Sequence, residues 1–286
     1  MFYFQLKGGL GNQMFQYAAA RALSLHRGIP LRVDFDDPYK FVKREYGLDS
    51  FEVNVKHATK KELKNVKPLT KLQKYLAILT GKDPNQNLVT EKKDYTYDKT
   101  FFETPDNSYL SGFWQNEKYF IKYRNIIIGD FKLKNEPEGL NSYYLKHINT
   151  QLNSISVHIR RGDYVENPMA LSSHGICDVE YYKKAYSFFE KLNTNNFYYC
   201  FSDDALWVEE NLWFIQNKII ITNNDNNPAE DLRLMSNCKH NIIANSSFSW
   251  WGAWLNENPN KNVIAPSKWT NIHYKPDIIP SNWIIL

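Results

Sequence analysis

The first 35 residues alternate between apolar runs and one helix-like segment. Met1–Lys7 is rich in aromatic and apolar side chains and predicts a strand, and Leu31–Phe35 predicts a second one. Gln13–Arg27 carries helix-forming residues and predicts a helix. Gly28 marks its end, because glycine commonly follows the last turn of a helix. Gly8–Gly11 predicts a flexible turn between strand and helix. The pattern is that of a βαβ unit, whose glycine loop lies at the carboxyl edge of a parallel sheet, where ligands bind.

The pattern is less regular from Asp36 to Asn153. Lys60–Lys82 is a lysine-rich helical stretch, and Tyr95–Tyr123 mixes polar with aromatic side chains. Because neither stretch carries clear start or stop signals, the sequence predicts no element limits there.

Regular alternation of strands and helices returns in the second half. The predicted strands are Ser154–Arg160, Phe197–Phe201, Lys218–Ile221 and His240–Ala244, and the predicted helices are Asp178–Leu192, Ala205–Phe214, Pro228–Cys238 and Phe248–Asn256. Alternation at this spacing predicts a parallel, doubly wound sheet. The second half is therefore expected to be a Rossmann-like domain.

Length and composition set the scale of this picture. At 286 residues the chain favours two packed units over one large α/β unit, and 43% hydrophobic residues are enough to bury a real core. The 35 basic and 31 acidic residues leave a net charge of +4, which is too small and too dispersed to indicate a nucleic-acid partner. A basic groove for a small anion stays compatible with this charge.

The cysteines and the amino terminus favour a cytoplasmic protein. Cys177, Cys200 and Cys238 are widely spaced, so neither a disulfide framework nor a Cys-rich metal site is indicated. The amino terminus lacks the basic region and long apolar core of a signal peptide, and no apolar window approaches a membrane span. The lysines of Lys56–Lys99 could touch an anionic membrane, although such runs are more often a solvated surface, so peripheral contact with the inner membrane stays an alternative.

The glycine loop is the first candidate ligand site. Gly8–Gln13 lets main-chain amides approach a ligand, and the following helix terminus offers further N–H donors to a phosphate. Met14 stands where the dinucleotide fingerprint needs glycine, and the Gly-Lys-Ser/Thr of a Walker loop is absent. A simple tight turn is the competing interpretation.

His158–Tyr164 (HIRRGDY) is the second candidate. Alternation along a strand points His158 and Arg160 to the same face. An arginine can hold a pyrophosphate through two parallel hydrogen bonds and neutralise the charge that grows on a departing nucleoside diphosphate. The competing interpretation is that Arg160 and Arg161 pair with nearby acids such as Asp163.

Two further segments begin where a predicted strand ends. Phe201–Asp204 and Asn245–Trp251 therefore occupy ligand-facing positions of an open α/β sheet. Ser246 and Ser247 could cap the following helix and leave its free amides for phosphate, although capping alone would also explain them. The tryptophans of the helix predicted at Phe248–Asn256 have the spacing of a buried face, so core packing is favoured over sugar stacking: Trp250, Trp251 and Trp254.

Asp34 and Asp36 form a possible metal site. Two carboxylates at a strand end could hold Mn²⁺ or Mg²⁺ with a nucleotide diphosphate. Arg160 already offers positive charge for the phosphate, and aspartates commonly end strands in turns. The metal-free interpretation is therefore preferred, with no metal and no cofactor expected.

Three long motifs together resemble one family. Gly8–Ala18 (GGLGNQMFQYA), His158–Tyr164 (HIRRGDY) and Ile243–Leu255 (IANSSFSWWGAWL) look like the signature set of the α-1,2-fucosyltransferases, which include bacterial surface-glycan enzymes and vertebrate blood-group H transferases. The motifs occur in the right order and span both ends of the chain.

The resemblance implies an α/β protein of the GT-B fold, with two Rossmann-like domains facing a central cleft. Residues 1–153 would form the acceptor-side domain with a variable helical insert, and residues 154–286 would bind GDP-fucose. The reaction implied is inverting transfer of L-fucose, without a metal, to a galactose-terminated glycan. A bacterial enzyme of lipopolysaccharide (O-antigen) or capsule synthesis is expected, whose oligomeric state the sequence leaves unknown.

The resemblance also assigns residues. His158 and Arg160 would contact the nucleotide and pyrophosphate, and Arg160 and Asp163 would be catalytic, with Asp163 the first choice of base and Glu166 the second. The other predicted GDP-fucose contacts are Asn12 and Gln13 in the glycine loop, Asp203 or Asp204 at the guanosine, and Ser246, Ser247 and Phe248 at the phosphates.

Two alternatives stay open at this stage. A phosphate clamp does not identify the hexose, so another GDP-sugar or another fucose linkage is the competing activity. A non-catalytic glycan- or nucleotide-binding module is the competing class, because the chain holds eight tryptophans. That module would bind without turnover.

Overall fold

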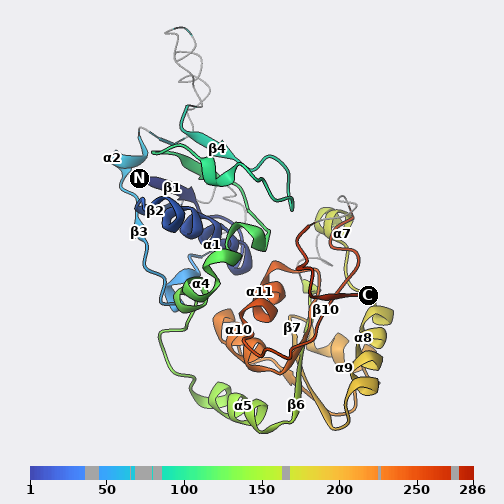
Figure 1. The fold of residues 1–286 in the computed structure, drawn as a ribbon. Coiled ribbons are helices and arrows are strands. Elements are labelled where there is room, and N and C mark those ends of the chain that lie inside the picture. The colour runs from blue at the N-terminus through green and yellow to red at the C-terminus, as the bar shows by residue number, and fades with distance from the viewer. Residues whose placement is uncertain are drawn as a thin grey trace. The chain divides into compact units, whose positions relative to one another are not determined.

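The computed structural model describes residues 1–35, 45–64, 66–67, 79, 86–162, 168–224, 227–271 and 277–286. The chain divides into two compact units, Met1–Lys132 and Leu133–Leu286 (Figure 1). None of the described helices is both long and apolar enough to cross a membrane.

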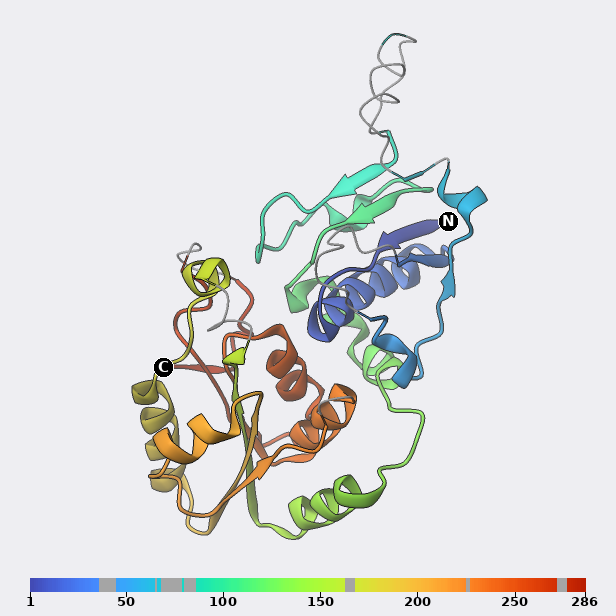
Figure 2. The ribbon, with the colours of Figure 1, turned by 180° about the vertical axis from the view of Figure 1, so that it is seen from behind.

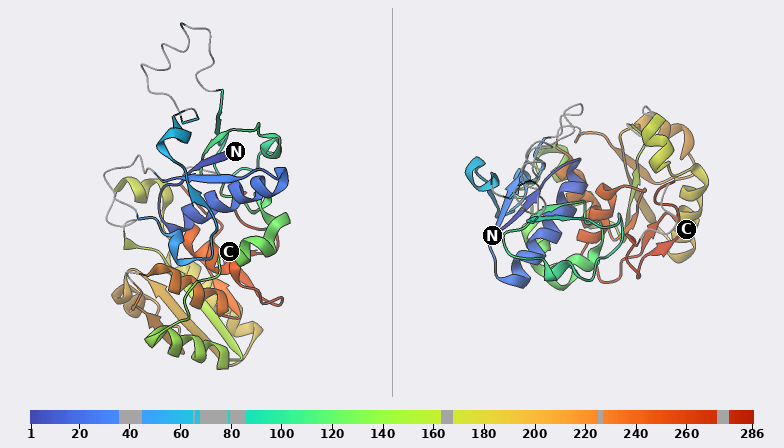
Figure 3. Two further views of the ribbon diagram at one scale, coloured as in Figure 1. Left: turned by 90° about the vertical axis from the view of Figure 1, so that its left-hand side faces the viewer. Right: turned by 90° about the horizontal axis from the view of Figure 1, so that it is seen from above.

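The first unit is built on a five-stranded parallel sheet in the order β3-β2-β1-β5-β4. The strands are β1 Phe2–Gln5, β2 Leu31–Asp34, β3 Lys56–His57, β4 Leu88–Thr90 and β5 Tyr109–Ser111. Helix α1 (Leu10–Arg27) follows β1 and contacts both β1 and β2 (Figure 3). The predicted βαβ unit is therefore confirmed, including its end at Gly28, which adopts φ 65° and bonds back to Ser24.

Short helices complete the first unit. They are η1 Leu48–Ser50, α2 Lys60–Leu63, η2 Phe101–Glu103, η3 Glu117–Tyr119, η4 Ile121–Tyr123 and α4 Arg124–Asp130. Thr59 and Glu62 form a capping box that starts α2. Helix α2 ends at Leu63, and most of the predicted lysine-rich stretch up to Lys82 lies outside the described residues.

The second unit carries a six-stranded parallel sheet in the order β11-β10-β9-β6-β7-β8. Its strands are β6 Asn153–Ile159, β7 Asn196–Ser202, β8 Lys218–Ile221, β9 His240–Ile242, β10 Val263–Ala265 and β11 Ile284–Ile285. Its helices are α5 Gly139–Thr150, α7 Pro168–His174, α8 Val179–Leu192, α9 Ala205–Asn211, α10 Pro228–Asn237 and α11 Ser247–Leu255. The predicted doubly wound sheet is confirmed; β10 and β11 are short strands that the pattern did not reveal.

Alternation along β7 builds the core on both faces of this sheet. Tyr198 and Cys200 pack with residues of α8 and α9, whereas Tyr199 and Phe201 pack with residues of α5 and α10. Figure 2 shows α8 and α9 on one face and α10 and α11 on the other. Both faces are thus covered, as expected for an all-parallel sheet.

Helix α5 belongs to the second unit. Ile148 is fully buried among side chains of β7, β8 and α10, and Asn141 exchanges side-chain hydrogen bonds with Asn224 at 2.9 and 3.1 Å. The compact units therefore divide at residues 132 and 133, whereas the motif-based domain limits were placed at 153 and 154. The acceptor-side and donor-side roles of the two units stay predictions.

Candidate active site

The order of strands in the second sheet places a topological switch point at the carboxyl ends of β6 and β9. The chain moves outward from β6 to β7 and β8, and then returns to the other side of β6 through β9, β10 and β11. Connections that leave in opposite directions open a crevice at such a switch point, the usual ligand site of an open α/β sheet. His158 and Arg160 stand at the end of β6, and Ser246 follows β9.

His158 presents a buried, unsatisfied ring nitrogen at this switch point. Its side chain is buried against Phe248 with ring centroids 5.7 Å apart, and its Nδ1 atom has no hydrogen-bond partner among the described residues. Burial, followed by the positive charge of Arg160, lowers the pKa of His158 to about 3. The imidazole is therefore neutral at physiological pH and has one ring nitrogen for a ligand.

Arg160 is held by Asp203 across the two neighbouring strands. Arg160 Nη1 donates to Asp203 Oδ2 at 2.7 Å, and the main-chain N–H of Arg161 donates to Asp203 Oδ1 at 2.9 Å. The Arg160 side chain is 29% exposed, so the ion pair stays accessible to a ligand. Arg160 and Arg161 are thus paired with acids, as the competing interpretation held. Their partners are Asp203 and Asp204, one of which the family resemblance had assigned to guanosine.

Asp204 forms a second clamp beside the first. Its Oδ2 accepts from Arg161 Nε at 3.2 Å, and its Oδ1 accepts from the main-chain N–H of Trp207 at 3.1 Å, which caps α9. The Arg161 guanidinium lies 4.3 Å from the centre of the Trp207 ring, within cation–π range. Sequence reasoning missed Trp207, because this contact depends on the pairing of β6 with β7. Contact of Asp203 or Asp204 with guanosine stays a prediction.

The amino terminus of α11 lies at the end of β9. Ser246 is buried, and its Oγ accepts from the main-chain N–H of Phe248 at 3.3 Å, so the predicted cap is observed. Ser247 and Phe248 begin the helix, whose positive end suits an anion. The three tryptophans of α11 are buried, which confirms core packing: Trp250, Trp251 and Trp254.

Tyr181 holds the chain just after β9, and Gly252 lies where α11 packs on α10. The Tyr181 hydroxyl donates to the carbonyl oxygens of Ile243 and Ile264 at 2.6 and 3.1 Å. A side chain on Gly252 would place its Cβ 2.8 Å from Met235 Sδ, so the glycine lets α11 approach α10 closely. The predicted phosphate-binding terminus is therefore held by buried contacts.

In the first unit, the glycine loop joins β1 to α1 as predicted. Gly8 has φ 78°, and a Cβ there would lie 2.9 Å from Asn12 Nδ2. Asn12 Oδ1 accepts from Gln115 Nε2 at 2.7 Å. Gln13 is buried, and its Nε2 donates to the carbonyl oxygens of Gly8 and Glu45 at 2.9 and 2.8 Å. Both side-chain donors of Gln13 are thus engaged in shaping the loop.

Asp34 is engaged by other side chains. Its Oδ2 lies 3.0 Å from Lys67 Nζ and accepts from the Tyr109 hydroxyl at 2.5 Å. The other half of the candidate metal pair, Asp36, lies outside the described residues. In the part of the chain that the structure describes, no group of three or more His, Cys, Asp or Glu side chains could hold a metal ion.

Asp163 and Glu166 both lie in 163–167, outside the described residues, and their roles stay predictions.

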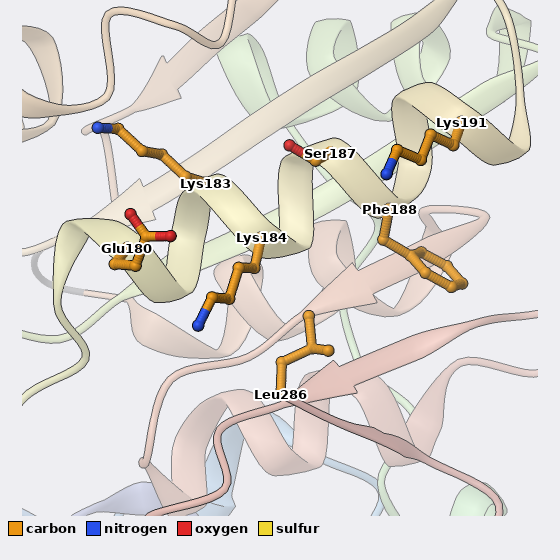
Figure 4. Close-up of a pocket in the computed structure, with 7 residues that line it drawn as sticks. All are labelled: Glu180, Lys183, Lys184, Ser187, Phe188, Lys191 and Leu286. Atoms are coloured by element: carbon orange, nitrogen blue, oxygen red, sulfur yellow. The ribbon is translucent and has the colours of Figure 1, made fainter.

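A shallow surface pocket of about 320 Å³ lies along the outer face of α8 (Figure 4). None of its lining residues is a predicted site residue: Glu180, Lys183, Lys184, Ser187, Phe188, Lys191 and Leu286. It is therefore separate from the switch-point residues.

Comparison with known proteins identifies relatives along the whole chain. An O-antigen biosynthesis glycosyltransferase, WbnK, of Escherichia coli is 34% identical, covering 98% of this chain and 99% of the relative. An α-1,2-colitosyltransferase of Escherichia coli is also 34% identical, covering 93% of this chain and 91% of the relative. The galactoside α-(1,2)-fucosyltransferase 2 of Oryctolagus cuniculus is 23% identical, covering 59% of this chain and 50% of that protein.

The fold also matches a solved structure. The fucosyltransferase NodZ from Bradyrhizobium superposes with a TM-score of 0.52 at 12% identity, covering 88% of this chain and 91% of NodZ. The chain accordingly has the GT-B fold, built from two parallel-sheet α/β units.

The family profile described as "Glycosyl transferase family 11" matches residues 55–286, which include the whole second unit and its switch point. With full-length relatives at 34% identity, this protein belongs to glycosyltransferase family 11.

Proposed function

We propose that the protein transfers L-fucose from GDP-β-L-fucose in α-1,2 linkage to a terminal galactoside of an oligosaccharide or glycolipid, with inversion and without a metal ion. The observation that carries the proposal is the meeting of His158, Arg160 and the α11 terminus at one switch point, in a family 11 glycosyltransferase. A neutral imidazole, a guanidinium and a helix amino terminus are together suited to a nucleoside diphosphate. The α-1,2 linkage and the galactoside are supported by the names of the relatives.

The reaction needs one displacement at the anomeric carbon. The acceptor oxygen forms a bond to C1 of fucose as the bond from C1 to the β-phosphate oxygen breaks, and that electron pair leaves with GDP. The acceptor proton passes to a base, for which Asp163 stays the first prediction and Glu166 the second. Arg160 stabilises the charge that grows on GDP, a type of contribution worth about 100- to 1000-fold in kcat.

The remaining donor contacts follow from the same geometry. His158 offers Nδ1, while Ser246, Ser247 and Phe248 offer the α11 terminus to the phosphates. Asn12 of the first unit stays a predicted contact of GDP-fucose. Gln13 would contribute through the loop that it shapes, because both its side-chain donors are already engaged.

Metal independence has two supports in the described residues. Arg160 supplies positive charge where a metal would otherwise neutralise the diphosphate. Asp34, one of the two carboxylates that could have held the metal, is engaged by Lys67 and Tyr109. We therefore expect transfer to survive a chelator.

The biological setting follows from the relatives. The 34% identity to an O-antigen glycosyltransferase supports a role in bacterial lipopolysaccharide biosynthesis. A location in the cytoplasm, with peripheral contact at the inner membrane as an alternative, stays a prediction. The acceptor would then be a precursor glycan ending in galactose.

A second candidate activity is transfer of colitose in the same linkage. It is favoured by the relative named as an α-1,2-colitosyltransferase, which is as similar as any reported above. Colitose is fucose without the 3-hydroxyl, so a single hydroxyl on the donor distinguishes the two activities. Such discrimination requires a polar group that pairs with that hydroxyl.

The test is GDP release and product linkage with a panel of GDP-sugars and terminal galactosides, in EDTA. Arg160→Ala is compared with Arg27→Ala, a control arginine of similar exposure that is paired with Asp106 in the first unit. The proposal is supported if GDP is released from GDP-fucose only when a galactoside is present, if this release persists in EDTA, and if Arg160→Ala abolishes it while Arg27→Ala does not. Release only from GDP-colitose would select the second candidate, and loss in EDTA would contradict metal independence.

A further inference from the structure

Asp203 makes two short hydrogen bonds at the end of β6. One carboxylate oxygen accepts from Arg160 Nη1 at 2.7 Å, and the other accepts from the main-chain N–H of Arg161 at 2.9 Å. The carboxylate therefore fixes both the guanidinium and the main chain that carries it. Charge-assisted bonds of this type are stronger and more directional than neutral ones.

The sheet and a glycine build this contact. The parallel register pairs Ile159 with Ser202, so Arg160 and Asp203 are the residues that directly follow a matched pair. A Cβ on Gly162 would lie 2.7 Å from Asp203 Oδ2. A side chain at position 162 would therefore displace this carboxylate from its present position.

We infer that Asp203 is a positioning residue for the transfer reaction, which acts by aiming the Arg160 guanidinium at the leaving diphosphate rather than by binding guanosine. The inference rests on the proposed function, since it needs Arg160 to meet the diphosphate. An arginine side chain has several rotatable bonds, and ordering one costs about 2 kcal/mol of rotamer entropy. The ion pair with Asp203 orders the Arg160 side chain before the donor binds, so this rotamer entropy is not lost in the binding step.

The exposure of the pair distinguishes this role from a structural one. The two side chains are 29% and 28% exposed, and ion pairs of this exposure contribute about 1 kcal/mol or less to stability. Loss of Asp203 should therefore change the melting temperature little. A misplaced catalytic group, by contrast, lowers the rate by about 100-fold.

The experiment is a double-mutant cycle on the full chain, with Asp203→Ala, Arg160→Ala and the combined variant. We expect Asp203→Ala to lower kcat by about 100-fold with a smaller change in the KM of the GDP-sugar. The combined variant should be no worse than Arg160→Ala, because the carboxylate acts through the guanidinium. Asp203→Asn, which keeps an acceptor oxygen, should recover part of the rate.

The controls separate the possible failures. Glu230→Gln breaks another ion pair of the same unit, between Glu230 and Arg233 on α10, and should leave kcat unchanged. Two results would overturn the inference in favour of a guanosine contact. One is a combined variant whose loss of kcat is the product of the two single losses. The other is an Asp203→Ala variant that discriminates less well between GDP and ADP. If the wild type uses only another GDP-sugar, the fucose proposal fails, and the same cycle run with that donor still decides the role of Asp203.

Discussion

The buried imidazole of His158 makes the second unit sensitive to mild acid. The pKa of His158 is lowered to about 3 in the folded chain, first by burial and then by Arg160. In the unfolded chain the imidazole takes up a proton near its ordinary pKa of about 6.5, so unfolding binds a proton at any pH between about 3 and 6.5. The free energy of unfolding therefore falls as the pH falls through this window.

The size of the effect follows from the shift. Each pH unit below about 6.5 removes somewhat over 1 kcal/mol, so about 2 kcal/mol is lost by pH 5 and about 5 kcal/mol by pH 3. The loss is large beside the 5–15 kcal/mol that typically stabilises a domain. His240, whose pKa is lowered by burial and by Lys239, adds a contribution of the same sign.

The assay is denaturant unfolding followed by tryptophan fluorescence at pH 7, 6 and 5. Seven of the eight tryptophans belong to the second unit, with only Trp114 in the first, so the signal reports mainly the unit that holds His158. His158→Gln, which cannot titrate, should flatten the dependence on pH by about 2 kcal/mol between pH 6.5 and pH 5. His240→Gln measures the second contribution separately. Equal slopes for the wild type and His158→Gln would refute the reasoning.

Three further perturbations test the packing around the site. Gly252→Ala should destabilise the second unit by about 1–3 kcal/mol in thermal melts, since its Cβ would overlap Met235; a rise in stability would show that the two helices can separate at no cost. Tyr181→Phe leaves the carbonyl oxygens of Ile243 and Ile264 without their hydroxyl donor and should cost about 1–3 kcal/mol in thermal melts; an unchanged melting temperature would contradict a stabilising role for this hydroxyl. Gln13→Leu removes both donors that hold Gly8 and the segment at residue 45, so we expect faster amide hydrogen exchange in that loop; unchanged exchange would contradict its bridging role.

The sequence was most informative where local pattern and chemistry coincide. β6, β7 and the start of α11 are bounded by polar motifs, and their placement at strand ends was predictable from alternation alone. The side-chain pairs were not, because Arg160 and Asp203 are brought together only by the order and register of neighbouring strands. Two segments that the sequence treats as separate ligand sites form one ion-paired cluster in the folded chain.

The elements that the sequence did not predict are short strands and a helix with little apolar pattern. β4, β5 and β10 have three residues each and β11 has two, too few to show a period. Helix α5 buries only Ile148, so its sequence shows little of the apolar stripe that would assign it to a core. Its place in the second unit is set by packing and by amide hydrogen bonds to Asn224, which are properties of the folded chain.

The attachment of α5 decides where related chains can be recombined. A chimaera that takes residues 1–153 from a relative would replace Ile148 by that relative's residue, while the side chains of β7, β8 and α10 around it would still come from this chain. A junction at residue 133 carries α5 with its own partners. Exchange of the first unit between family members should therefore succeed with the earlier junction, because it keeps Asn141 and Asn224 in one parent sequence.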